Sequence, residues 1–242
     1  MKQIIVIPAR LKGTRLPGKP LMKILGKSII WRVWNQCQKV HSKDRIFVAT
    51  EDVEIENHCK HFGINCVVTE KANTAIDRIK LFSDLIKADA YINVQGDEPI
   101  INTKDVLTIL KYNKKFPSRV VFGKTTANET EFYDFSKAKV VCDLSGRLLY
   151  SSRAGMPINS QGKFVSAQRA IWIYAFTRKD LIKYYEHNHH TPLEEIEDNE
   201  IIRFIEIGIP VYCVDVIGDS WAVDERKDIK IVEELILERN IE

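Results

Sequence analysis

Short apolar runs alternate with amphipathic segments through the first half of the chain. A short run that is apolar almost throughout is typical of a strand buried on both faces. Such runs predict strands at residues 3–8, 45–49, 65–69 and 90–94. The segments between them repeat their apolar positions at helical spacing, which predicts helices at residues 28–40, 52–62 and 75–88. This alternation predicts an α/β fold with a mostly parallel sheet flanked by helices.

The second half of the chain is less regular. A turn at residues 144–146 separates two short apolar stretches and predicts a hairpin of residues 139–142 and 147–150. Further strands are predicted at 170–176 and 211–216, and helices at 178–187, 194–206 and 225–239. No repeat, low-complexity segment or linker divides the chain. We therefore expect one domain, residues 1–242, with a small inserted lid or dimerisation lobe.

Composition narrows the class of protein. The net charge of +3 is too small for a nucleic-acid-binding surface, and the basic residues cluster only between residues 10 and 27. The five cysteines form no C-x-x-C pair, which favours reduced thiols and argues against structural zinc. No apolar stretch approaches the ~20 residues that cross a bilayer, and the first apolar run is too short for a signal peptide. We expect a cytoplasmic protein with no nucleic-acid or membrane partner.

A basic segment with glycines, R-L-K-G-T-R-L-P-G-K-P, follows the first predicted strand at residues 10–20. Glycine lets the backbone approach a ligand closely, and backbone N–H groups beside fixed cations form a cradle for phosphates. A solvated basic loop is the competing interpretation, but this density of cations beside glycines exceeds what solvation requires. We predict an anion site whose cations are Arg10, Lys12, Arg15 and Lys19 and whose glycines are Gly13 and Gly18.

The same segment almost matches the P-loop of nucleotide triphosphatases, because Gly13, Gly18 and Lys19 have the spacing of that motif. The position after the lysine must then carry a Ser or Thr hydroxyl that binds Mg²⁺. Here it is Pro20, which has neither a hydroxyl nor a backbone N–H. The P-loop interpretation is therefore excluded on chemical grounds.

An acidic turn, Q-G-D-E-P at residues 95–99, ends the strand predicted at 90–94. Asp97 is therefore expected at the carboxyl edge of the sheet, where parallel sheets bind their ligands. A carboxylate there suits Mg²⁺, and phosphoryl-type chemistry combines cations on the phosphates with a metal held by one or two carboxylates. Alone this segment would be an ordinary turn, but the basic loop on the same edge makes it a candidate site.

A second carboxylate is needed to hold a metal firmly, and Asp224 is the candidate. It lies in S-W-A-V-D-E-R, immediately before the terminal helix. Asp is also a common helix N-cap, so spacing alone leaves both the cap and the metal ligand open for Asp224.

These motifs resemble the CMP-Kdo synthetases, or 3-deoxy-manno-octulosonate cytidylyltransferases, of the nucleotide-diphospho-sugar transferase superfamily, over nearly the whole chain. The specific matches are I-P-A-R at 7–10, T-R-L-P-G-K-P-L at 14–21 and V-Q-G-D-E-P at 94–99. Shorter matches are K-V-V-C-D at 139–143, Y-S-S-R-A at 150–154, I-Y-A-F at 173–176, P-L-E-x-I-E at 192–197 and V-D at 223–224. The resemblance implies a Rossmann-like fold, usually a homodimer, that joins CMP from CTP to an acidic 2-keto sugar for lipopolysaccharide or capsule biosynthesis.

The resemblance also assigns roles by position. Asp97 and Asp224 would ligate Mg²⁺, and the catalytic set would be Arg10, Lys19, Asp97 and Asp224. The nucleotide-binding set would be Pro8, Ala9, Arg10, Gly13, Thr14, Arg15, Lys19, Arg78, Gln95 and Gly96. The acceptor-binding set would be Gln95, Tyr174 and Glu197. The sugar hydroxyl would attack the α-phosphorus of CTP directly, so that catalysis rests on alignment and charge neutralisation.

The chain departs from the family where the family meets base or sugar. The family loop H-x-S-G-T-D/E-R is replaced by N-T-A-I-D-R at 73–78, and its His before I-G-I-Y is missing from R-A-I-W-I-Y at 169–174. We expect CMP transfer to be retained, with Kdo or with amino-Kdo, another ulosonate or a sugar-alcohol phosphate as acceptor. Trp172 either narrows the acceptor pocket or is a core aromatic. A nucleotide-binding relic without activity is the alternative from another class, and the retained cations and carboxylates argue against it.

Overall fold

A nine-stranded sheet forms the centre of the molecule in the computed structural model, which describes residues 1–13, 16–187 and 190–241. Its main path runs β11-β7-β10-β6-β1-β4-β5, with β8 and β9 attached beside β10. The strands of this path are β1 Gln3–Pro8, β4 Ile46–Thr50, β5 Cys66–Val68, β6 Ala90–Val94, β7 Val120–Ala127, β10 Ala167–Phe176 and β11 Val211–Asp215. The predicted strands of the first half are thereby confirmed, with end points within a residue or two.

The sheet is mostly parallel, as the alternation predicts. β1 lies parallel to both β4 and β6, β4 is parallel to β5, and β11 is parallel to β7. The exception is β10, which runs antiparallel between β6 and β7. Parallel neighbours bring their carboxyl ends to one edge, so the segments that follow β1 and β6 meet there.

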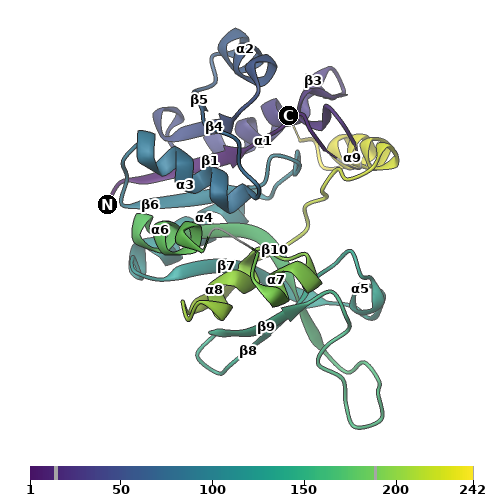
Figure 1. Cartoon of the computed structure of the whole chain (residues 1–242). Helices are drawn as coiled ribbons and strands as arrows, with labels where there is room; N and C mark the ends of the chain where they lie inside the picture. The colour runs from purple at the N-terminus through teal and green to yellow at the C-terminus, as the bar shows by residue number, and fades with distance from the viewer. Residues whose placement is uncertain (14–15, 188–189, 242) are drawn as a thin grey trace.

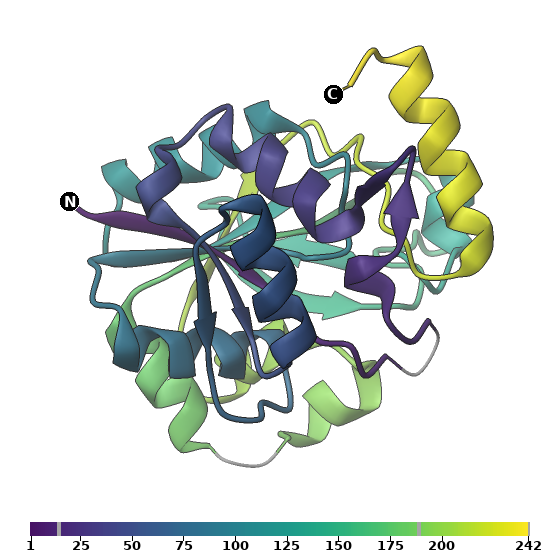
Figure 2. The same cartoon turned by 90° about the horizontal axis from the view of Figure 1, so that it is seen from above.

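Helices cover both faces of the sheet (Figures 1 and 2). One apolar cluster unites the sheet with residues of α1 Ile29–Gln38, α2 Val53–Phe62 and α4 Thr103–Lys115. The other unites it with residues of α3 Ala75–Leu85, α6 Arg178–Glu186 and α8 Ile201–Glu206. The side chain of Ser28 caps α1 by accepting from Trp31 N at 3.2 Å, and Gly63 ends α2 with φ 62°. No helix of the described chain is long and apolar enough to cross a bilayer.

A small lobe extends from the sheet at the lower edge of Figure 1. It consists of the hairpin β8 Lys139–Cys142 and β9 Leu148–Ser152, the short helix α5 Glu129–Tyr133 and the loop that leads into β10. The hairpin confirms the predicted pair of strands around a glycine turn, with Gly146 at φ 81°. This lobe corresponds to the inserted lobe of the predicted architecture.

The terminal helix α9 Arg226–Glu238 packs at one side of the molecule against the small hairpin β2 Lys23–Ile24 and β3 Lys27–Ser28 (Figure 2). A separate apolar cluster joins them through Ile24, Val232 and Ile236. The helix is therefore held against a segment that directly follows the basic loop. Two short 3₁₀ turns, Lys19–Leu21 and Lys43–Arg45, complete the elements of the N-terminal half.

Two predictions from the sequence need correction. The helix predicted at 194–206 is two helices, α7 Pro192–Glu197 and α8, because Asp198 adopts a left-handed conformation with φ 47° and ends the first. The sequence also predicts no element between residues 100 and 138, where the structure has α4, β7 and α5.

Candidate active site

The ends of β1 and β6 lie side by side and place the basic loop opposite the acidic turn. Position 96 must be glycine, because a Cβ there would lie 2.5 Å from the carbonyl oxygen of Pro8. A cavity of about 240 Å³ opens at this edge. Its lining residues are Pro8, Ala9, Arg10, Lys12, Gly13, Leu16, Lys19, Pro20, Ala72, Thr74, Ala75, Arg78, Gln95, Gly96, Asp97 and Asp224.

The basic loop is folded by its own backbone. Both Gly13 N and Gly18 N donate to the carbonyl of Leu11, at 3.0 and 2.9 Å, and Leu11 N donates to Asp52 Oδ2 at 2.7 Å. Arg10 is exposed, and its guanidinium reaches the carbonyl of Asn73 at 3.4 Å. The predicted contacts Thr14 and Arg15 lie outside the described residues, so these two remain predictions.

Lys19, Asp97 and Asp224 meet in the lining of this cavity. Lys19 Nζ lies 2.7 Å from Asp97 Oδ2 and 3.4 Å from Asp224 Oδ1. The main chain also joins the two acidic segments, because Val223 N donates to the Asp97 carbonyl at 2.9 Å. Residues separated by more than 200 positions thus form one charged cluster at the carboxyl edge.

The helix-cap interpretation of Asp224 is wrong. The N-cap of α9 is Glu225, and its partner in the capping box is Asp228. The Asp228 carboxylate accepts from Asp224 N at 2.8 Å and from Glu225 N at 2.7 Å. The side chain of Asp224 instead faces Lys19.

A divalent metal fits this arrangement when substrate supplies part of its shell. The described residues contain no group of three or more His, Cys, Asp and Glu side chains that could hold a metal by themselves. Asp97 and Asp224 nevertheless face the same cation, the ammonium of Lys19. Mg²⁺ is commonly bound by one or two carboxylates together with phosphate oxygens, and two convergent carboxylates meet that requirement.

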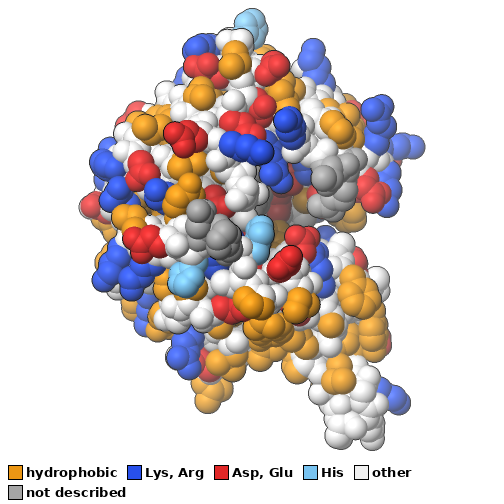
Figure 3. All heavy atoms as spheres, viewed as in Figure 1, with side chains coloured by type: hydrophobic (Ala, Val, Ile, Leu, Met, Phe, Trp, Pro, Cys, Tyr) orange, Lys and Arg blue, Asp and Glu red, His pale blue; other side chains and the backbone are white. Residues whose placement is uncertain are grey.

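A second, larger cavity of about 640 Å³ adjoins the first and shares Arg10, Thr74, Ala75, Gln95, Asp97 and Asp224 with it. Its other lining residues are Asn73, Glu98, Ser136, Arg153, Trp172, His190, Glu194, Glu195, Asp198, Asn199, Glu200 and Ala222. Figure 3 shows this face of the molecule hollowed near its centre, with charged side chains at the margin. The charged cluster therefore lies between two compartments, as a transfer between two bound substrates requires.

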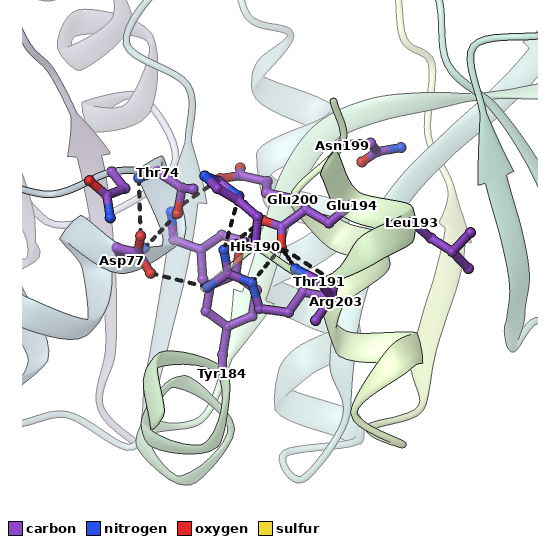
Figure 4. Close-up of polar contacts among 12 residues, drawn as sticks. Thr74, Asp77, Tyr184, His190, Thr191, Leu193, Glu194, Asn199, Glu200 and Arg203 are labelled. Atoms are coloured by element: carbon purple, nitrogen blue, oxygen red, sulfur yellow. Dashed lines mark hydrogen bonds and ion pairs between the residues drawn. The ribbon is translucent and has the colours of Figure 1, made fainter. Parts of the chain in front are cut away.

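One wall of the larger cavity is braced by a buried arginine. Arg203 of α8 contacts Glu194 through Nε at 2.6 Å and Nη2 at 2.7 Å, and its Nη1 lies 3.6 Å from Asp77 Oδ1 (Figure 4). The exposed fractions of these three side chains are 4%, 3% and 7%. Burial alone would lower the pKa of Arg203, but its bonds to Glu194 raise it, so the guanidinium stays charged.

The contacts in this wall extend to the start of α3, which also lines the first cavity. Asp77 forms a capping box with Thr74, which lines both cavities. The Glu200 carboxylate accepts from Ile76 N at 3.3 Å, in the first turn of the same helix (Figure 4). Burial raises the pKa of Glu200 to about 7. The segment around residue 74 is thus fixed by side chains from the opposite half of the chain.

Most predicted nucleotide contacts line the first cavity, but two predicted acceptor contacts lie elsewhere. Arg78 is 2% exposed and is held by Thr69 Oγ1 and Glu51, both at 2.9 Å. Tyr174 is fully buried, with its ring stacked on Phe122, and is not among the described residues of either lining.

Glu197 likewise stays outside both described linings and holds the end of β9 and the residue after it, accepting from Tyr150 Oη at 3.2 Å and from Arg153 N at 3.0 Å. Sequence reasoning gave no role to Thr74, Glu98 or Glu200, although all three line the larger cavity. For Glu98 the signal was available, since it follows Asp97 inside the acidic motif.

An α/β sheet that carries a basic glycine loop opposite two carboxylates, with adjoining cavities on either side, defines a nucleotide-dependent group-transfer enzyme. The family model described as cytidylyltransferase matches residues 4–215, and the chain belongs to that family. The 3-deoxy-manno-octulosonate cytidylyltransferase of Chlamydia pneumoniae is 35% identical over 96% of this chain and 92% of its own. That of Escherichia coli is 32% identical over 92% of this chain and 91% of its own.

Similarity to solved structures agrees with the sequence similarity to cytidylyltransferases. A CMP:2-keto-3-deoxy-manno-octonic acid synthetase complexed with CTP superposes with a TM-score of 0.91, at 30% identity, over 99% of this chain and 100% of that one. A cytidylyltransferase from Leptospira borgpetersenii shares the fold, with a TM-score of 0.67 at 17% identity over 98% of this chain and 87% of that one. The similarity to CMP-Kdo synthetases therefore covers both compartments of the site as well as the sheet.

Proposed function

We propose that this protein transfers CMP from CTP to an acidic 2-keto sugar, Kdo or a close relative, and releases pyrophosphate. The observation that carries the proposal is the cluster of Lys19, Asp97 and Asp224 between two adjoining cavities. The likeness to CMP-Kdo synthetases over nearly the whole chain supports the choice of CTP and of the acid sugar.

In this proposal the smaller cavity holds CTP. Arg10 and Lys19 neutralise the triphosphate, and the glycines let the backbone of the loop come close to it. Arg78 is too buried to move freely and presents a fixed positive charge beside the nucleotide. Asp97 and Asp224 would hold a divalent metal, Mg²⁺, which would supply charge neutralisation for the transfer.

The larger cavity then holds the acceptor with its hydroxyl facing the α-phosphorus. Gln95 lines both cavities and lies where the two substrates meet. The hydroxyl oxygen forms the new P–O bond while the bond to pyrophosphate breaks, and the hydroxyl proton is released. Catalysis requires alignment of two bound substrates and compensation of negative charge, both of which these residues supply.

The test is pyrophosphate release with CTP and Mg²⁺ across a panel of acidic sugars that begins with Kdo. Asp97→Asn is expected to abolish release, by about 10³-fold or more, while CTP still binds. Asp89→Asn is the matched control, because Asp89 directly precedes the same strand at its opposite end. A nucleotide-binding relic would bind CTP but release no pyrophosphate with any acceptor.

Assembly and location complete the proposal. The likeness to the family supports a homodimer in the cytoplasm, and size-exclusion chromatography with light scattering tests the oligomeric state. A monomer that is fully active would contradict the dimer without affecting the proposed reaction.

A further inference from the structure

Trp172 lies in the wall of the larger cavity rather than wholly in the core. Its ring centroid is 5.7 Å from that of Phe122 and 6.3 Å from that of Tyr174, so one side of the indole rests on the aromatic core of the sheet. The side chain is only partly buried, and it lines the space that adjoins the charged cluster. Both interpretations that the sequence left open are therefore partly right: Trp172 packs on the core and also faces the cavity.

An irregularity in β10 accompanies this position. β10 pairs with β7 at Ile171 and Gly123, and the next pair along the strand is Tyr174 with Phe122, so two residues of β10 lie opposite none of β7. Bulges of this kind re-aim a side chain and are frequent beside active sites. Gly123 permits it, because a Cβ at that position would lie 2.8 Å from the carbonyl oxygen of Ile171.

The indole is chemically distinct from the rest of the lining. Among the described lining residues of this cavity, the other apolar side chains are those of Ala75 and Ala222, and Trp172 alone is large. A sugar presents hydroxyl groups at its edges and C–H groups on a face. A cavity with polar walls and a single large apolar surface matches that distribution, since the indole can cover the C–H face while the walls bond the hydroxyls.

We propose that Trp172 determines acceptor specificity: its indole packs against the nonpolar face of the acid sugar and limits how bulky that sugar can be. This inference rests on the proposed function, because it assumes that the larger cavity holds the acceptor. It concerns acceptor binding alone, since Trp172 is not among the described residues that line the smaller cavity.

The test compares Trp172→Ala and Trp172→Phe with the wild type in the pyrophosphate assay. Trp172→Ala is expected to raise the KM for the accepted acid by roughly tenfold while the KM for CTP changes less than about twofold. It is also expected to gain turnover with a bulkier acid such as N-acetylneuraminic acid. Trp172→Phe keeps an aromatic face, so its KM for the acid should lie between those of the wild type and Trp172→Ala. Equal rises in both KM values, or an unchanged acceptor KM in the folded alanine variant, would overturn the inference.

Tryptophan fluorescence supplies a readout that a merely structural role would not change. The chain has four tryptophans, of which Trp31 lies on α1, away from both described linings. Titrating the accepted acid, with CTP and Mg²⁺ present, should alter the emission of the wild type and of Trp31→Phe but not of Trp172→Phe. The same emission change in Trp172→Phe would count against the inference. A wild type that releases no pyrophosphate with any acid would instead refute the proposed function itself.

Discussion

Lys19 Nζ lies 2.7 Å from Asp97 Oδ2 and so joins the basic loop after β1 to the acidic turn after β6. The side chains are 20% and 30% exposed, so the pair is partly shielded from water and weakly screened. Asp224 contacts the same ammonium at 3.4 Å. One lysine thus contacts both carboxylates, and we expect its ammonium to turn toward phosphate when CTP binds.

Replacing Lys19 by methionine should therefore have opposite effects on turnover and on metal affinity. Turnover is expected to fall by about 10²- to 10³-fold, because a cation at the triphosphate is lost. The ligand-free variant should bind Mg²⁺ more tightly, because no ammonium competes for Asp97 and Asp224. Pyrophosphate assays and calorimetric Mg²⁺ titration measure the two effects. Lys23→Met, which removes an exposed charge from neighbouring β2, is the control, and similar behaviour of both variants would contradict the prediction.

Arg203→Met should destabilise the fold much more than the loss of a surface ion pair. The variant leaves Glu194 and Asp77 buried beside an apolar side chain, which costs about 3–5 kcal/mol. Denaturant unfolding measures the loss. Adding Glu194→Gln to Arg203→Met should recover part of it, since one buried charge is then removed.

Arg178 provides the matched surface case, because it pairs with Asp84 at 2.8 Å while 40% exposed. Arg178→Met is expected to cost at most about 1 kcal/mol. Similar losses of unfolding free energy in Arg203→Met and Arg178→Met would contradict the prediction that the buried ion pairs stabilise the fold more than the surface pair does.

Glu200→Gln should remove a loss of folding stability that develops as pH rises. Burial raises the pKa of Glu200 from 4.5 to about 7 in the folded protein, so the folded state keeps a proton that the unfolded state releases within this window. The free energy of unfolding therefore decreases as pH rises from about 4.5 to about 7.

The glutamine variant keeps an oxygen acceptor for Ile76 N and should lack this decrease, so that its free energy of unfolding exceeds that of the wild type by on the order of 3 kcal/mol at pH 7.5. Unfolding curves at pH 4.5, 6 and 7.5 test it. Parallel pH profiles for the two proteins would contradict the assigned proton.

Gly96→Ala should damage the nucleotide site through the backbone. The added Cβ would lie 2.5 Å from the Pro8 carbonyl oxygen, so the ends of β1 and β6 must move apart. We expect CTP affinity to fall by about tenfold or more, measured by calorimetry. Gly162→Ala is the control for backbone strain away from the site, because nothing lies within 4 Å of its Cβ position although its φ of 72° disfavours alanine. Unchanged CTP binding in Gly96→Ala would mean that the edge tolerates the shift.

The sequence identified elements with strong local signals and missed those set by tertiary context. The apolar runs of β1 and β6 are almost uninterrupted, and both strands were predicted within their observed ends. β7 was overlooked because its apolar stretch, residues 120–122, is only three residues long and leads through Gly123 into polar residues. That β10 inserts antiparallel beside β6 depends on partners distant in sequence, which no local pattern records.

The same distinction applies to the site. Residues that adjoin strand ends, such as Lys19 and Asp97, follow from the rule that parallel sheets bind ligands at their carboxyl edge. Glu200 could not be found this way, because it reaches the site from a helix that packs across the sheet. Asp224 was ambiguous until the structure assigned the cap to Glu225.

The position of Asp224 along the chain has a consequence for biosynthesis. The first carboxylate and the basic loop are translated early, whereas the second carboxylate is translated more than a hundred residues later and is followed directly by α9. Because α9 packs through Val232 and Ile236 onto Ile24, the segment that carries Asp224 is held beside Lys19. If Asp224 has its proposed role, a nascent polypeptide lacks one of its two metal ligands until the segment that precedes α9 has been synthesised.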